Sequence, residues 1–348
     1  IVNRKLNTAK YMDASSNSQD LAEKIKITVE HETPKVRVVF MGTPQFAGTI
    51  LADLLEHHYN IVGVVTQPDK PAGRKQELAA SRVKEIATEH TLPLLQPEKI
   101  DEATIDAIKS WKPDLVIVAA YGRILPETLL RVPGFGCVNV HASLLPKWRG
   151  SSPIHNTLLS GETETGVTIM LMDAGMDTGD IIAKESTAIE LDETRPDLEI
   201  RLAALGSELL RRILPDFVER RITPEKQDDT QATLCQLIDR EDGRVFWDAD
   251  SQTIYDRYRA LTPWPGIFTY WKHEESPLRL KLITISHLKQ SPQIKHALGE
   301  VFEIGEAVGV QTTTGVIILE EVQLEGKERT DIKAFVNGYK NFIGSSLQ

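Results

Sequence analysis

Apolar runs alternate with amphipathic segments through the first two thirds of the chain. The run at 35–42 predicts a strand that turns at Gly42 into a helix, with Pro44 as first residue and Thr43 as cap. Helical patterns follow at 81–90 and 100–111. This alternation predicts βαβ units and a mostly parallel, Rossmann-like α/β sheet covered by helices. The other predicted strands lie within 60–69, 113–122, 137–142, 166–175 and 180–187.

The pattern changes towards the C-terminus. A long helix with one apolar stripe is predicted first, and we expect that stripe to pack on the sheet. A polar stretch, residues 223–243, follows it, and a helix is predicted at 250–261. Short strands separated by glycines come next, a pattern typical of a small antiparallel OB-like β-barrel. The apolar stripe consists of Leu198, Leu202, Leu205, Leu209, Ile213 and Phe217.

A length of 348 residues favours more than one domain. We expect residues 1–34 to be a mobile tail, or to reflect a misplaced start, because they lack a signal-peptide core and carry acidic residues. Residues 35–222 are predicted to be the catalytic domain, 223–243 a linker, and 244–348 the C-terminal domain. No run of 18 apolar residues predicts a membrane-spanning helix.

Composition narrows the possible chemistry. The two cysteines, Cys137 and Cys235, lie far apart, which argues against a disulfide scaffold or a zinc cluster and suits a reducing cytoplasm. Taken alone, the net charge of −10 argues against a nucleic-acid partner, although it does not describe a local patch. No His/Cys/Asp cluster has the spacing of metal ligands, so no metal is expected.

The candidate chemistry gathers at predicted strand ends. Asn139 and His141 are two residues apart at the end of an apolar run, so their side chains share one face. The glycine-rich stretch 172–180 follows another strand and carries Asp173, Asp177 and Asp180. Because ligands bind at the carboxyl edge of parallel sheets, we expect these groups to meet there. An amide, an imidazole and a carboxylate together suit acyl transfer through a stabilised oxyanion, although a strand-end His alone fits a structural role equally well.

Two other chemistries are disfavoured. No serine or cysteine lies in a nucleophile elbow, so a covalent acyl-enzyme is not expected. The stretch "FMGTPQFA" is neither GxGxxG nor a Walker loop, so a turn with a helix cap is favoured over phosphate binding.

Residues 139–182, "NVHASLLPKWRGSSPIHNTLLSGETETGVTIMLMDAGMDTGDII", resemble the catalytic core of the folate-dependent formyltransferases. In that family an Asn-x-His, an SLLP signature and an Asp in a glycine-containing loop form the site, which implies that Asn139, His141 and Asp177 are catalytic here. "TQPDKPAGR", "KWRGSSPI", "LTPWPGIFTYW" and the closing "KAFVNGYKNFIGSSLQ" resemble the branch that formylates methionyl initiator tRNA. The resemblance runs from about Lys35 to the end of the chain.

The resemblance implies 10-formyltetrahydrofolate as co-substrate. Ser143, Leu144, Leu145 and Pro146 would form one wall of the folate site, and Arg123, Ile124 and Leu125 the other. Without the resemblance, a strand-to-helix turn with Pro at the helix start is the favoured interpretation of "YGRILP". Asn139 and His141 would stabilise the oxyanion, while Asp177 orients His141 and helps to move protons.

The implied partner is methionyl initiator tRNA, bound by a monomer. In the family, the loop matching 68–78 enters the acceptor arm, which implies Arg74 as the main contact, with Lys70 and Lys75; the alternative is a solvated loop. Gln76 and Glu77 depart from the lysines usual there and weaken the expected phosphate contacts. Lys147 and Arg149 would meet the acceptor end.

The C-terminal barrel, with its mixed charge, would contact the tRNA body weakly and in a salt-sensitive way. There Trp264 and Trp271 are either an aromatic surface or, as we favour, packing residues. Other acceptors remain open, namely a sugar nucleotide or glycinamide ribonucleotide. A folate- or RNA-binding module without turnover is the further alternative.

Overall fold

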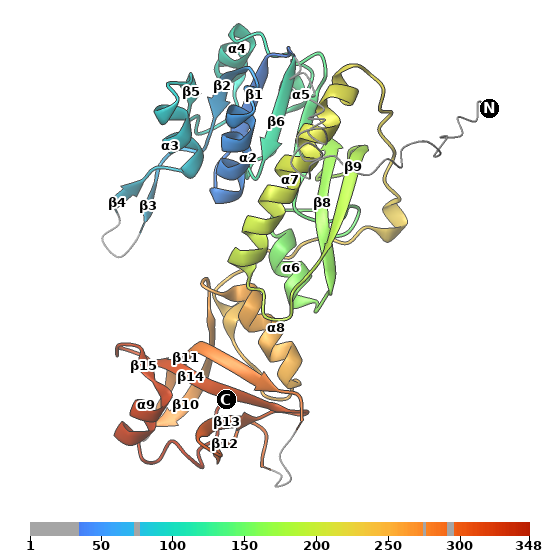
Figure 1. Ribbon diagram of the computed structural model, residues 1–348. Coiled ribbons are helices and arrows are strands. Elements are labelled where there is room, and N and C mark those ends of the chain that lie inside the picture. Colours follow the sequence, from blue (N-terminus) through green and yellow to red (C-terminus); the bar gives the residue numbers. More distant parts are fainter. Residues whose placement is uncertain (1–34, 73–76, 274–275, 291–295) are drawn as a thin grey trace, which may run out of the picture. The chain divides into compact units, whose positions relative to one another are not determined.

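The strands predicted for the N-terminal part assemble into one sheet in the computed structural model (Figure 1). The structure describes residues 35–72, 77–273, 276–290 and 296–348, and within them this sheet has seven strands in the order β5-β2-β1-β6-β7-β8-β9. The strands are β1 (Val38–Gly42), β2 (Ile61–Val65), β5 (Leu94–Leu95), β6 (Leu115–Ala119), β7 (Cys137–His141), β8 (Glu164–Leu171) and β9 (Ile181–Ala188).

Five neighbouring strands of the sheet, β5, β2, β1, β6 and β7, run parallel to one another. The strand β8 runs antiparallel to β7, and β9 runs antiparallel to β8. The prediction of a mostly parallel, Rossmann-like sheet is confirmed. The expectation that the strand within 166–175 ends at the same edge as β7 is wrong, because β8 pairs Leu171 with Val138 and Thr168 with His141. The loop after β8 therefore starts beside the beginning of β7 and must turn back to reach its end.

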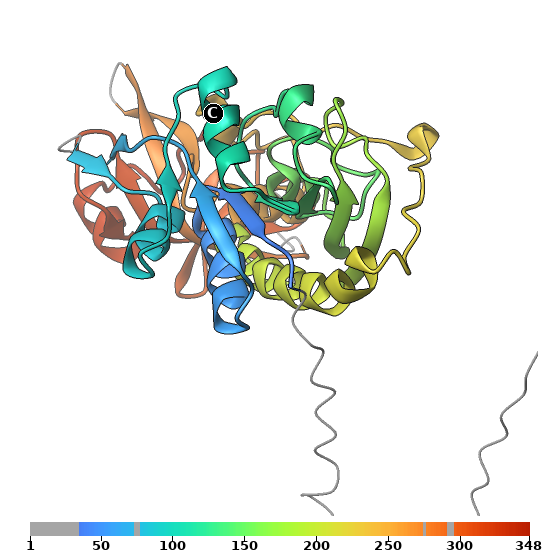
Figure 2. The same ribbon diagram turned by 90° about the horizontal axis from the view of Figure 1, so that it is seen from above.

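Helices cover both faces of this sheet (Figure 2). They are α2 (Gln45–Glu56), α3 (Arg82–Glu89), α4 (Glu102–Ser110), α5 (Glu127–Leu130), α6 (Pro153–Leu159) and α7 (Arg195–Val218). Alternate strand residues face opposite sides, so that Phe40 and Ile117 join one core cluster while Met41 and Val118 join the other. Within this domain, α2, α3, α6 and α7 pack in the first cluster, and α4 and α5 pack in the second.

The start of α2 differs from the prediction. Pro44, not Thr43, is the N-cap residue, and no side chain caps this helix. The Thr43 hydroxyl instead lies between two other strand ends, donating to the Tyr121 carbonyl and accepting from the Gln67 N–H, both at 3.4 Å. Thr43 therefore ties together the loops that follow β2 and β6.

The long helix α7 packs on the sheet as its apolar spacing predicts. At its N-terminus the Thr194 N–H donates to the Asp197 carboxylate at 3.2 Å, one half of a capping box. Along the predicted stripe, Leu205 is partly buried and the other five residues are buried.

The C-terminal domain forms an antiparallel sheet in the order β10-β11-β14-β13-β12, with β15 paired to β14. The C-terminal residues hydrogen-bond to both edges of it: Gln348 exchanges bonds of 2.8 and 2.9 Å with Tyr270 of β10, while Leu347 donates to the Gly299 carbonyl at 2.8 Å, just before β12. These contacts close the sheet, as expected for a small barrel. Its elements are α8 (Ser251–Leu261), β10 (Ile267–His273), β11 (Ser276–Leu288), β12 (Val301–Ile304), β13 (Ala307–Gln311), β14 (Val316–Leu324), β15 (Thr330–Asp331) and α9 (Ile332–Gly338).

The two tryptophans considered for this domain differ. Trp271 is fully buried and packs edge-on against Phe335 and Phe342, so its predicted packing role is confirmed. Trp264 is 53% exposed, and for this residue the packing prediction is wrong.

Residues 223–243 run along the N-terminal domain. Glu225 forms a bridge with Ile181, and Leu234 forms one with Arg149. The segment contains two short helices, η1 (Asp229–Gln231) and η2 (Glu241–Gly243). The domain boundaries proposed on either side of it stay predictions.

The stretch predicted as a basic loop is a β-hairpin, in which β3 (Lys70–Ala72) pairs with β4 (Glu77–Ala79). Arg74 and Lys75 lie outside the described residues, as does the tail predicted for residues 1–34. Across the described ranges, no helix is long and apolar enough to cross a membrane.

Candidate active site

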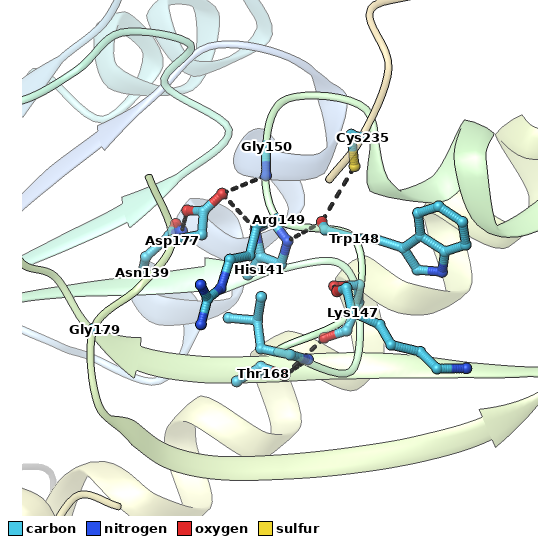
Figure 3. Close-up of polar contacts among 12 residues, drawn as sticks. Asn139, His141, Lys147, Trp148, Arg149, Gly150, Thr168, Asp177, Gly179 and Cys235 are labelled. Carbon is cyan, nitrogen blue, oxygen red and sulfur yellow. Dashed lines mark hydrogen bonds and ion pairs between the residues drawn. The ribbon is translucent and has the colours of Figure 1, made fainter. Parts of the chain in front are cut away.

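Three side chains singled out in the sequence lie together at the end of β7 (Figure 3). Asn139 and His141 are 8% and 6% exposed, and they project from alternate positions of the strand. The Asn139 amide donates to Asp177 Oδ1 at 3.4 Å, and His141 Nδ1 lies 3.7 Å from Asp177 Oδ2. The structure therefore brings the three groups together, although β8 reaches the site from the opposite direction to the one expected.

Both ring nitrogens of His141 face polar groups. Nε2 lies 3.0 Å from the Trp148 carbonyl oxygen, and because a carbonyl only accepts, Nε2 carries a hydrogen. Nδ1 faces the Asp177 carboxylate. With the hydrogen on Nε2, Nδ1 is the acceptor nitrogen of the neutral ring, and it lies beside the negative charge of Asp177.

The Asp177 carboxylate is held from a second loop. The backbone N–H of Gly150 donates to Asp177 Oδ2 at 2.8 Å (Figure 3). Asp177 itself has a φ of 54°, in the left-handed region that Asp tolerates better than most residues. The loops after β7 and β8 thus jointly determine where this carboxylate points.

A cavity of about 510 Å³ opens beside these groups. This volume lies within the range of about 300–1,000 Å³ usual for small-molecule and cofactor sites. Its wall combines the loop after β6, the end of β7, the segment from Gly150 to His155 that leads into α6, the loop from Met172 to Asp177, and the first turns of α7. Asn139, His141 and Asp177 all belong to this wall.

Of the two predicted folate segments, only one reaches the cavity. Arg123, Ile124 and Leu125 are part of its wall. Leu125 is buried, whereas Ile124 is 84% exposed. The Arg123 guanidinium donates to the Pro97 carbonyl at 3.2 Å and also to the Glu98 carbonyl. Arg123 therefore fixes the position of this loop, and Ile124 presents apolar surface at the cavity.

The other predicted segment, Ser143 to Pro146, does not line the cavity. Ser143 and Leu145 are fully buried, and the Ser143 hydroxyl donates to the Lys147 carbonyl at 2.7 Å. Thr168 of β8 bridges the turn by accepting from the Leu145 N–H and donating to the Ser143 carbonyl. These bonds turn the segment away from the site and make it the support of the Trp148–Gly150 loop.

The cations predicted to bind tRNA fall into different surroundings. Lys70 is exposed on β3, and Lys147 is exposed beside Glu162 at 3.1 Å. Arg149 is only 6% exposed and pairs with Asp229 at 2.7 Å. The prediction that Arg149 meets the acceptor end is contradicted, because its guanidinium is buried within the protein.

Three ionisable cavity residues escaped the sequence analysis: His155 on α6, and Arg195 and Glu199 at the start of α7. Burial, and secondarily the charge of Arg195, lower the pKa of His155 to about 4, so His155 is neutral near pH 7. The Arg195 guanidinium lies 2.5 Å from the Glu199 carboxylate. Nothing in the spacing of these residues distinguishes them from ordinary helix positions, and only the packing of α6 and α7 brings them to the cavity.

No group of three or more His, Cys, Asp or Glu side chains in the described part of the chain is arranged to hold a metal ion. The polar groups of the cavity wall are instead suited to hydrogen bonding and proton transfer.

Comparison with known families matches both parts of the chain. Residues 35–214 match the family described as Formyl transferase, and residues 237–340 match Formyl transferase, C-terminal domain. The methionyl-tRNA formyltransferase of Citrifermentans bemidjiense is 42% identical over 314 residues, covering 90% of this chain and 96% of that protein. The protein of the same name from Caldicellulosiruptor saccharolyticus is 43% identical over 314 residues, covering 89% and 99%.

Solved structures show the same fold at lower identity. An N-formyltransferase from Helicobacter canadensis, in complex with folinic acid and dTDP-3-aminofucose, has a TM-score of 0.60 at 18% identity, covering 82% of this chain and 98% of that one. A methionyl-tRNA formyltransferase from Clostridium thermocellum has a TM-score of 0.51 at 20% identity, covering 83% and 98%.

Proposed function

The chain belongs to the formyl transferase family, and we propose that it transfers a formyl group from 10-formyltetrahydrofolate to the α-amino group of methionyl initiator tRNA. The product, N-formylmethionyl-tRNA, serves translation initiation. Relatives named methionyl-tRNA formyltransferase, at 42% and 43% identity over about nine tenths of the chain, support this acceptor.

The observation that carries the proposal is the convergence of Asn139, His141 and Asp177 on the wall of one cavity. Acyl transfer to an amine needs donors for the developing oxyanion and a path for the amine's proton. The three side chains supply an amide donor, an ionisable imidazole and a carboxylate. A protein that only bound folate or RNA would need none of this arrangement.

The transfer makes one C–N bond and breaks another. The α-amino nitrogen attacks the formyl carbon, and the carbonyl oxygen becomes a tetrahedral oxyanion. As that intermediate collapses, the bond between the formyl carbon and N10 of the folate breaks, and the proton lost by the amine is delivered to N10.

The three side chains divide the tasks of this scheme among them. The Asn139 amide stabilises the oxyanion by donating a hydrogen bond. His141 Nδ1 receives the amine's proton, and the imidazolium so formed stabilises the oxyanion by its charge. Asp177 orients the ring and stabilises that positive charge, because its carboxylate lies 3.7 Å from Nδ1. His141 then returns the proton towards the departing folate nitrogen.

The folate would lie in the cavity between the loop at Arg123–Leu125 and the loop that carries Asp177. Ser143, Leu144, Leu145 and Pro146 would support this site from behind rather than form its wall. No metal takes part in the proposed scheme.

The tRNA would meet the hairpin β3–β4 and the C-terminal barrel. Lys70 is exposed on that hairpin and Lys147 is exposed near the site, whereas Arg149 is withdrawn from this set. Arg74 and Lys75, between the two hairpin strands in sequence, stay proposed contacts. We propose that the protein is a monomer and acts in the cytoplasm, where charged tRNA and folate are available.

The test is formylation of defined acceptors by the purified chain. It is incubated with 10-formyltetrahydrofolate and methionyl initiator tRNA, dTDP-3-aminofucose or glycinamide ribonucleotide, and the products are identified by mass spectrometry. We expect that, of the three acceptors, only the tRNA is formylated, to give N-formylmethionine. The His141→Ala variant should form no product while retaining the circular dichroism spectrum of the wild type. Formylation of the sugar nucleotide or ribonucleotide instead of the tRNA, or near-normal turnover by His141→Ala, would overturn the proposal.

A further inference from the structure

Gln227, in the segment between α7 and the C-terminal domain, lies against the loop that carries Asp177. Its Nε2 donates to the backbone carbonyl of Asp177 at 2.8 Å and to that of Gly179 at 2.7 Å. Its Oε1 accepts from Arg149 Nε at 3.1 Å and from Arg149 Nη2 at 2.8 Å. The amide thus uses both of its donors and both lone pairs of its acceptor, its full hydrogen-bonding capacity.

These bonds join the two loops that form the catalytic centre. Arg149 directly precedes Gly150, whose N–H holds the Asp177 carboxylate at 2.8 Å. Gln227 therefore contacts the backbone of Asp177 on one side and Arg149 on the other, and Arg149 is next to the residue that donates to the Asp177 carboxylate. The described contacts of Gln227 all lead to this pair of loops.

The backbone of the Asp177 loop is strained and tightly packed, so it depends on outside contacts to keep the carboxylate in place. Asp177 has a left-handed φ of 54°, which costs an L-residue roughly 1 kcal/mol. At Gly179, an added Cβ would lie 1.8 Å from the Leu171 carbonyl oxygen, so the backbone passes directly against β8. A turn held in this way depends on the groups that satisfy its carbonyls, and for Asp177 and Gly179 that group is the Gln227 amide.

The segment that carries Gln227 is itself anchored on both sides. Glu225 and Ile181 exchange backbone bonds of 2.7 and 2.8 Å before it. After it, Arg149 donates to the Thr233 carbonyl at 2.9 Å and Cys235 donates to the Arg149 carbonyl at 2.8 Å. The Cys235 thiol also donates, at 3.2 Å, to the Trp148 carbonyl that accepts from His141 (Figure 3). The segment is thus a fixed part of the site's surroundings.

We propose that Gln227 is a positioning residue for formyl transfer, acting through Asp177. This inference rests on the proposed function. By holding the Asp177 loop against the Arg149–Gly150 loop, the amide keeps the carboxylate facing His141 Nδ1 and Asn139. Gln227 does not line the cavity, so its loss should affect the chemical step more than substrate binding.

The test is the Gln227→Glu variant in the full-length protein. A carboxylate of the same shape still accepts from Arg149, but it has no hydrogen to donate to the carbonyls of Asp177 and Gly179. We expect kcat to fall about 10- to 100-fold, because small displacements of a catalytic group have effects of that size. KM for 10-formyltetrahydrofolate and for methionyl initiator tRNA should stay within about threefold of wild type.

Gln231→Glu is the matched control. Gln231 lies four residues further along the same segment, is exposed, and donates to Asp228 at 2.7 Å, away from the cavity. It should retain the wild-type kcat. If Gln227→Glu fails to fold, judged by its melting curve, Gln227→Met takes its place, since it has the same length and no hydrogen bonds.

The outcomes separate this inference from the function on which it rests. If the wild-type protein does not formylate methionyl-tRNA, the proposed function fails. If the wild type is active and the Gln227 variant keeps its kcat, or loses activity only through raised KM values, the positioning role is refuted. A fall in kcat at constant KM, absent from Gln231→Glu, supports it.

Discussion

Replacing Asp177 with Asn tests the electrostatic part of the proposed scheme. The change keeps the size of the side chain and removes its charge. Asp177 Oδ2 lies 3.7 Å from His141 Nδ1, and the two side chains are 16% and 6% exposed. At an effective dielectric constant of about 20, opposite unit charges at that separation attract by roughly 4.5 kcal/mol. An imidazolium formed in the transition state would lose most of this stabilisation.

Every 1.36 kcal/mol corresponds to a tenfold change in rate, so the loss amounts to about 10³-fold, or about 10² if the Asn amide dipole recovers part of it. The assay is single-turnover formylation of methionyl initiator tRNA at saturating 10-formyltetrahydrofolate, with folate binding measured separately by fluorescence. Asp180→Asn, which changes the same charge in the same loop outside the cavity wall, should stay near wild type. A rate for Asp177→Asn within tenfold of wild type, with folate binding intact, would refute the argument.

Two further predictions concern pH and tRNA. The pKa of His155 is lowered by burial to about 4 in the folded protein, from 6.5 for an ordinary histidine, so between these two pH values the unfolded chain binds a proton that the folded chain does not. The free energy of unfolding should therefore fall by up to about 3 kcal/mol as the pH drops from 6.5 to 4. Measured by urea unfolding, the fall in the free energy of unfolding at low pH should be smaller in His155→Gln than in the wild type. An equal fall in both proteins would contradict the prediction. Arg74→Ala should weaken tRNA binding more than folate binding, and it should reduce by about 1 the slope of log binding constant for tRNA against log salt concentration. Arg149→Ala should leave that slope unchanged and lower the melting temperature of the protein. Filter binding at several salt concentrations checks both, and equal losses of tRNA and folate binding in Arg74→Ala would count against that contact.

Local pattern was enough to locate most elements of the fold. The run at Leu115–Ala119 is buried at every position, as an unbroken apolar run predicts for a strand covered on both faces. The stripe along α7 is buried because apolar residues at a period of 3.6 lie on one face of a helix. The pair Asn139 and His141 was recognisable for a related reason, since residues two apart on a strand point to the same face.

Contacts between residues far apart in the sequence could not be predicted from this local pattern. The direction of β8, the burial of Arg149 and the place of Gln227 depend on segments that lie 27 to 80 positions apart in the chain, as the bonds from Gly150 to Asp177 and from Arg149 to Asp229 show. A cation or an amide in a polar stretch looks the same in sequence whether it meets solvent or a buried partner.

The amino-acid order thus specified the elements, the apolar faces and, through its motifs, the family of this chain. Folding alone settled which loops meet, in which direction β8 approaches β7, and which nitrogen of His141 faces Asp177. Side-chain periodicity is a property of consecutive residues, whereas strand direction and hydrogen-bond partners arise only when remote surfaces are buried against each other.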